Sequence, residues 1–146
     1  MAETTHAYET HIEWTSTLKG TLTAADRPPI LAGAPPEFGG TADVWSPEHL
    51  CVAAVNACVM LTFAAIAHNS KVPFRSYTAS AVGALERIDE RGPVFTRIVV
   101  KPRIVIGPEV DRSRVERLVA MAEKRCFVSN SLTATVTLEP QIITAA

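Results

Sequence analysis

The sequence predicts an α+β fold in which β-sheet wraps a central helix. Within Leu50–Ala67 only Asn56 and Thr62 are polar, and a helix that is apolar on every face must be buried on every face. Most of the remaining chain alternates polar and apolar residues at the period of two that is typical of strands. We expect Met1–Ala146 to form a single domain, because 146 residues suffice for one hydrophobic core.

The apolar stretch is also long enough to cross a membrane. However, six of the eighteen residues in Leu50–Ala67 are Ala, and neither end carries the Lys/Arg cluster that would set an orientation. We therefore expect a helix buried in protein and no membrane partner. The first fifteen residues lack the basic start and apolar run of a secretory signal, so we expect a cytoplasmic protein.

The composition favours small-molecule partners or copies of the same chain. The net charge is −1 and the charged residues, 20% of the chain, are dispersed, which indicates no nucleic-acid partner. Three cysteines are too few for a disulfide framework, and in a reducing compartment a pair of them is more plausibly reactive than structural. The alternative is that each is only a small buried hydrophobe.

The first third of the chain predicts short strands and a loop. His6–Thr15 alternates and predicts a half-buried strand, and Leu18–Ala24 predicts a second one. Asp26–Gly40 is rich in Pro and Gly and predicts a loop with one short strand at Ile30–Ala32.

The central helix has a strong start signal at Ser46-Pro47-Glu48. Ser46 suits the N-cap, Pro47 the first helical position, and Glu48 the first turn, where the helix dipole favours negative charge. A purely structural role for Glu48 therefore stays open beside a functional one.

Beyond the central helix the sequence predicts a long hairpin. Ser76–Arg87 and Val94–Val105 alternate as strands, and Asp89–Pro93 joins them with a Gly where a positive φ is needed. Thr133–Leu138 alternates again and is followed by a short apolar tail.

A second, amphipathic helix lies between these strands. Asp111 or Ser113 is its cap, and Ser113 with Glu116 forms a possible capping box. At helical spacing Cys126 returns to the apolar face and should point into the core. The apolar face comprises Val115, Leu118, Val119 and Ala122.

The order and spacing of several segments resemble the OsmC/Ohr family, which includes osmotically inducible proteins and organic hydroperoxide resistance proteins. These segments are Ser46–Leu50, Ala57-Cys58, Phe95–Ile98 and Cys126–Leu132. The resemblance implies an OsmC-like α+β fold with two antiparallel sheets wrapped around long central helices in an intertwined homodimer.

The resemblance also implies an activity. Many family members are thiol-dependent, peroxiredoxin-like peroxidases that reduce organic hydroperoxides without a cofactor and are recycled by a dithiol reductant, either a small molecule or a lipoylated protein. By position, Cys58 is the attacking thiol and Cys126 the resolving one. A thiolate attacks the O–O bond, and a second thiol traps the sulfenic acid before it is oxidised further.

The family pattern also supplies an Arg that favours the thiolate and a Glu that holds this Arg. Glu48 matches the Glu, but the expected Arg position near Ser16–Gly20 contains only Lys19 as a cation. We assign Lys19 in place of the Arg, although the ammonium of Lys lacks the rigid, planar fork of hydrogen-bond donors that the Arg guanidinium has. Ten residues of helix put Glu48 about 15 Å from Cys58. If Glu48 supports the thiolate, it must act from the partner chain or through a helix that starts late or bends.

Other residues give weaker signals. Cys51 cannot bridge Cys58 within an intact helix and is interpreted as packing. The four His residues show no metal-ligand spacing, so no metal site is expected. Two alternatives to a peroxidase stay open: an OsmC-like dimer with other thiol-redox or oxidant-sensing activity, and a non-enzymatic dimer that binds an apolar ligand.

Overall fold

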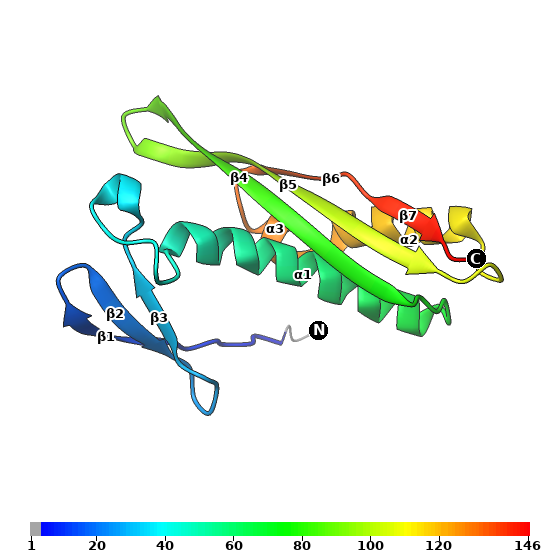
Figure 1. The fold of residues 1–146 in the computed structure, drawn as a ribbon, viewed down its shortest axis with the longest axis horizontal. Coiled ribbons are helices and arrows are strands. Elements are labelled where there is room, and N and C mark those ends of the chain that lie inside the picture. Colours follow the sequence, from blue (N-terminus) through cyan, green and yellow to red (C-terminus); the bar gives the residue numbers. More distant parts are fainter. Residues whose placement is uncertain (1–3) are drawn as a thin grey trace. The chain divides into compact units, whose positions relative to one another are not determined.

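A computed structural model describes residues 4–146, which form two compact units that divide between Leu50 and Cys51 (Figure 1). The first unit contains β1 (His11–Ser16), β2 (Lys19–Thr23), β3 (Ile30–Gly33) and the 3₁₀ helix η1 (Pro36–Phe38). Helix α1 (Pro47–Asn69) begins in the first unit and continues into the second. The remaining elements of the second unit are β4 (Ser76–Asp89), β5 (Gly92–Ile106), α2 (Arg112–Arg125), α3 (Phe127–Asn130), β6 (Thr135–Leu138) and β7 (Gln141–Thr144).

The first unit is an antiparallel sheet in the order β1-β2-β3. Its registers pair Ile12 with Leu22 and Gly20 with Ala32, and the short strand expected at Ile30–Ala32 is confirmed as β3. The first strand begins at His11 rather than His6, and all its residues are exposed in the single chain. The expectation of a half-buried first strand is therefore wrong for this chain alone, because no layer of its own unit covers it.

The second unit is built on the predicted hairpin of β4 and β5 (Figure 1). Gly92 closes it with a φ of 86°, a left-handed conformation that Gly adopts without strain. Both β6 and β7 pair with β5 in the parallel direction. This sheet is therefore mixed, which corrects the expectation of two antiparallel sheets. The tail strand β7 was also not predicted, because its four residues are too short to show a period.

The helices begin where the sequence places their caps. The hydroxyl of Ser46 accepts a hydrogen bond from the backbone N–H of His49 at 3.1 Å, so Ser46 caps α1. Asp111 caps α2 through the backbone N–H of Ser113 at 3.0 Å. Ser113 therefore lies inside the helix, and the capping box expected for Ser113 with Glu116 is not formed.

The core of the second unit lies between α1, α2 and the sheet. One stripe of α1 is buried: Val55, Val59, Phe63 and Ala67. These residues pack against β5 residues such as Ile98 and Ile104 and against the predicted apolar face of α2, whose four residues are all buried. Because β4 passes close to α1, a Cβ at Gly83 would lie 2.7 Å from a methyl carbon of Val52.

The opposite side of α1 is apolar but exposed in the single chain, with Leu61 60% exposed. One chain therefore does not bury this helix on every face, and the homodimer that the resemblance implies stays a prediction. Among residues 4–146, α1 is the one helix with the length and apolar composition of a membrane span. This is weak evidence for a span, since core helices of soluble proteins share these features.

Candidate thiol redox site

The structure brings together the two cysteines that the sequence singled out. Cys58 lies near the middle of α1, and Cys126 occupies the single position between α2 and α3. Cys126 is fully buried in a cluster with Val55, Val59 and the β5 residue Ile98, and Cys58 packs against this cluster. Both cysteines are free thiols.

The chain breaks its helix at Cys126. This residue has extended backbone angles, φ −67° and ψ 114°. Helix α2 therefore ends at Arg125, and Cys126 lies just outside it. Local hydrogen bonds hold the break: the Asn130 side-chain amide donates to the carbonyl of Lys124 at 3.1 Å, and the Ser131 hydroxyl donates to the carbonyl of Phe127 at 2.8 Å. The predicted burial of Cys126 is thus confirmed, although the helix does not persist that far.

The break supplies the groups that favour a thiolate at Cys58. Burial by itself raises the pKa of Cys58. Hydrogen bonds from the backbone N–H of Val128, the Cys126 side chain, Thr62 and the Phe127 backbone together outweigh it, so the pKa lies below its ordinary value. Thr62 contributes less than its proximity suggests. Its hydroxyl donates its single proton to the Cys58 carbonyl at 2.7 Å and lies 3.9 Å from the sulfur.

Cys126 is shifted the opposite way. Burial raises its pKa, and the neighbouring Cys58 adds to this against the hydroxyl of Ser129. The site therefore favours the thiolate at Cys58 and the neutral thiol at Cys126. This division suits a nucleophile at Cys58 and a thiol held in reserve at Cys126.

An apolar groove of about 600 Å³ runs beside Cys58 within the second unit. Its volume falls in the range of small-molecule sites. Besides Cys58, its lining includes Ala57, Leu61, Ile66, Arg125 and Phe127. One of the lining residues is the aromatic Phe127, whose side chain is 83% exposed to solvent in the single chain.

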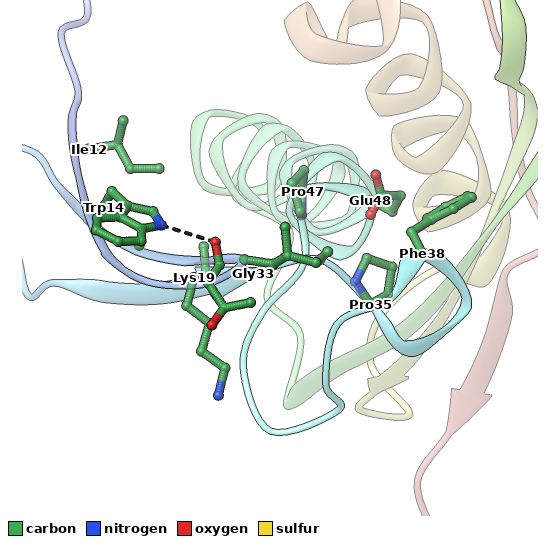
Figure 2. A pocket seen from close by; sticks show the side chains of 13 residues that line it. Ile12, Trp14, Lys19, Gly33, Pro35, Phe38, Pro47 and Glu48 are labelled. Atoms are coloured by element: carbon green, nitrogen blue, oxygen red, sulfur yellow. Dashed lines mark hydrogen bonds between the residues drawn. The ribbon is translucent and has the colours of Figure 1, made fainter.

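The other two predicted site residues line a different cavity, inside the first unit (Figure 2). This cavity is also about 600 Å³, and its walls include Trp14, Lys19, Phe38 and Glu48. The indole N–H of Trp14 donates to the carbonyl of Thr17 at 3.0 Å. The structure therefore groups Lys19 with Glu48 and, separately, Cys58 with Cys126.

Lys19 has a partner of opposite charge, whereas one carboxylate oxygen of Glu48 has no hydrogen-bond partner in the described part of the chain. The Lys19 ammonium binds both carboxylate oxygens of Asp43, at 3.0 and 3.2 Å, and in Figure 2 its side chain extends away from Glu48. The Thr41 hydroxyl and Lys19 lower the pKa of Asp43. In contrast, Oε1 of Glu48 is buried and has no hydrogen-bond partner among residues 4–146. Their roles toward Cys58 stay predictions.

Cys51 and the four His residues do not line the cavity beside Lys19 and Glu48 or the groove beside Cys58. Cys51 is a half-buried free thiol. Within residues 4–146 no three His, Cys, Asp or Glu side chains gather as a metal site would require.

Sequence reasoning missed the residues that follow and precede Cys126. Phe127 and Val128 favour the Cys58 thiolate through their backbone N–H groups, which no side-chain pattern can reveal. Arg125 lines the Cys58 groove, and its place next to a predicted resolving cysteine is a signal that could have identified it.

Comparisons with known proteins agree with this fold. A family model described as OsmC-like protein matches residues 40–141. An OsmC-like protein of unknown function from Vibrio cholerae is 24% identical with a TM-score of 0.85, covering 93% of this chain and 99% of its own. An organic hydroperoxide resistance protein OsmC from Legionella pneumophila is 19% identical with a TM-score of 0.75, covering 97% and 99%.

A further structure is an organic hydroperoxide resistance protein from Elizabethkingia anophelis with thiocyanate bound. It is 17% identical with a TM-score of 0.75, and the match covers 99% of this chain and 100% of that one. A search of curated protein sequences gave no match. At these identities the structural likenesses establish the fold.

The geometry predicts how Cys58 responds to pH. Since its pKa is lowered, thiolate absorbance of a Cys51→Ser protein should rise with a first midpoint below that of an unperturbed cysteine thiol. Reactivity of Cys58 should rise with pH through the same midpoint, because only the thiolate attacks.

Removing the Cys126 thiol should move the Cys58 midpoint upward, because the thiolate loses one of its partners. The Cys126→Ala variant tests this directly, and Cys51→Ser alone is the matched control. A midpoint that stays in place in Cys126→Ala would show that the two sulfurs do not interact.

Proposed function

The chain belongs to the OsmC-like protein family, and from that premise we propose that it is a thiol-dependent peroxidase that reduces organic hydroperoxides. The observation that carries the proposal is the Cys58–Cys126 pair, in which a thiolate-favouring site on a rigid helix contacts a neutral buried thiol. Two proteins of the same fold named as organic hydroperoxide resistance proteins support it.

In the first step the Cys58 sulfur attacks the terminal oxygen of the hydroperoxide. A S–O bond forms as the O–O bond breaks, so the OH group passes to sulfur and an alkoxide leaves and takes a proton from water. Sulfur is oxidised to a sulfenic acid and the peroxide is reduced to an alcohol. The mid-helix position suits this step because a fixed sulfur keeps its line of attack.

In the second step Cys126 attacks the sulfenic sulfur of Cys58. The S–S bond forms, the S–O bond breaks, and hydroxide leaves with the Cys126 proton as water. Neutral sulfenic acid no longer raises the pKa of Cys126 as the thiolate does, so oxidation of Cys58 itself readies the second thiol. A dithiol reductant then attacks the Cys58–Cys126 disulfide. The protein S–S bond breaks, both protein thiols are restored, and the reductant closes its own disulfide.

The same proposal includes a second copy of the chain. The exposed side of α1 carries Ala54, Ala57, Leu61 and Ala65, and contiguous apolar surface of this kind marks interaction sites. The exposed first strand, with Trp14 72% exposed, is also suited to cover by a partner. In such a homodimer Glu48 and Lys19 would act on the Cys58 of the partner chain.

Replacing each cysteine separately tests the two roles. Cys58→Ser should abolish peroxide consumption, because the attacking atom is lost. Cys126→Ser should allow a single turnover, leaving a Cys58 sulfenic acid that dimedone traps and excess peroxide over-oxidises. Cys51→Ser is the matched control and should retain turnover with a dithiol. Dimedone labelling of Cys126 or Cys51 as the first oxidised site would overturn the assignment.

The dimer is tested by placing a charge on the apolar side of α1. Ala65→Glu should weaken association, because the interface would then have to bury an unpaired carboxylate. Ala120→Glu makes the same change at an exposed helical alanine of α2 and should remain dimeric. Sedimentation velocity of both variants and the wild type is the measurement. A folded monomeric wild type at micromolar concentration would contradict the proposal.

A further inference from the structure

Ser129 carries a buried hydroxyl group. Its Oγ is shielded from solvent, and within residues 4–146 it has no hydrogen-bond partner. The other serine of the same turn is committed, since the Ser131 hydroxyl donates to the carbonyl of Phe127 at 2.8 Å. A buried polar group that lacks a hydrogen bond costs free energy. A serine at this position therefore calls for a partner that the resting site does not supply.

The turn places Ser129 beside Cys126. Cys126 is the N-cap of α3, Ser129 is the third residue of this short helix, and the backbone N–H of Asn130 closes the turn on the Cys126 carbonyl at 3.0 Å. Both the hydroxyl and the backbone N–H of Ser129 lower the pKa of Cys126. A neutral thiol is a weak acceptor and a thiolate is a strong one, so the hydroxyl gains its partner when Cys126 becomes charged.

Oxidation of Cys58 leaves Ser129 as the main residue that favours a charged Cys126. Burial raises the pKa of Cys126, and the Cys58 side chain raises it further. Among the groups that chiefly set this pKa, Ser129 alone lowers it. Once Cys58 is a neutral sulfenic acid, the opposition from its thiolate is removed, and Ser129 acts against burial alone.

The surroundings of Cys126 make this contact independent of a second chain. From α1 its titratable neighbour is Cys58, and the β4, β5 and β6 residues of its cluster are apolar. The basic residues that end α2, Lys124 and Arg125, are exposed to solvent. Because Cys126 and the Ser129 hydroxyl are already buried within one chain, a partner on the exposed side of α1 leaves their contact unchanged.

We propose that the Ser129 hydroxyl assists the second step by donating a hydrogen bond to the Cys126 sulfur as negative charge develops on it. This rests on the proposed function. Ser129 keeps its own proton, while the Cys126 proton leaves with the sulfenic oxygen as water and the S–S bond forms. The hydrogen bond is stronger in the transition state than in the resting site, and an interaction of this kind accelerates a step.

The test follows attack by Cys126 without a peroxide, in full-length Cys51→Ser protein. The reduced protein is mixed with one equivalent of dithiobis(nitrobenzoate), a symmetric aromatic disulfide. Cys58 displaces one thionitrobenzoate and holds the other as a mixed disulfide. Cys126 then attacks the Cys58 sulfur and displaces the second thionitrobenzoate. Stopped-flow absorbance resolves the two releases, and Cys126→Ser, which should give only the first, identifies them.

Adding Ser129→Ala should slow the second release about tenfold, the order expected for loss of one hydrogen bond to a developing charge, and should leave the first release unchanged. Ser129→Thr keeps a hydroxyl and should retain most of the rate. Ser131→Ala is the matched control, because it removes the other serine hydroxyl of the turn. An unchanged second release in Ser129→Ala, or an equal or larger loss in Ser131→Ala, would overturn the assignment.

A pH profile separates stabilisation of charge from loosened packing. The rate of the second release should rise with pH as Cys126 ionises, and Ser129→Ala should move the midpoint upward, because a group that lowers the pKa of Cys126 is lost. A rate that falls equally at every pH with an unmoved midpoint would contradict the proposal. Since no peroxide is used, a protein that reduces no hydroperoxide would refute the peroxidase proposal while this experiment still decides the role of Ser129.

Discussion

The packing of the buried α1 stripe against β5 and α2 is the contact on which the thiol pair depends. Phe63 and Ala67 fix one end of the helix in a core with the apolar face of α2, and Val55 and Val59 fix the other end around Cys126. Because interiors are close-packed, α2 cannot shift along α1 without opening cavities. The same contacts that stabilise the fold therefore hold Cys126 against Cys58.

Much of this fold could be predicted from local signals. The Ser46 and Asp111 caps, the α2 face and the β4–β5 hairpin each follow from residues close together in the sequence. The parallel pairing of β6 and β7 on β5 could not be predicted, because it joins short strands to distant partners. The apolar pattern of α1 predicts how much of the helix surface avoids water, but it does not say which chain covers each face.

The two reactive cysteines could be predicted, because their positions in the sequence match those of a thiol pair that reduces peroxides. The groups that lower the pKa of Cys58 could not be predicted. Backbone N–H groups at Phe127 and Val128 act through the helix break at Cys126, a three-dimensional feature. Arg125 is at the end of α2, where a basic residue already suits the helix dipole, so its position next to Cys126 was the one sequence signal for its place in the groove. Lys19 was chosen for its charge, and its pairing with Asp43 appears only in the structure.

The central claim is that Cys58 and Cys126 form one intramolecular redox pair, and mapping the disulfide tests it most directly. Reduced protein would be treated with one equivalent of cumene hydroperoxide, digested without reduction and analysed by mass spectrometry. The account predicts one new linkage, joining the Cys58 and Cys126 peptides of the same chain. A disulfide that includes Cys51, a linkage between chains, or unmodified cysteines would contradict it.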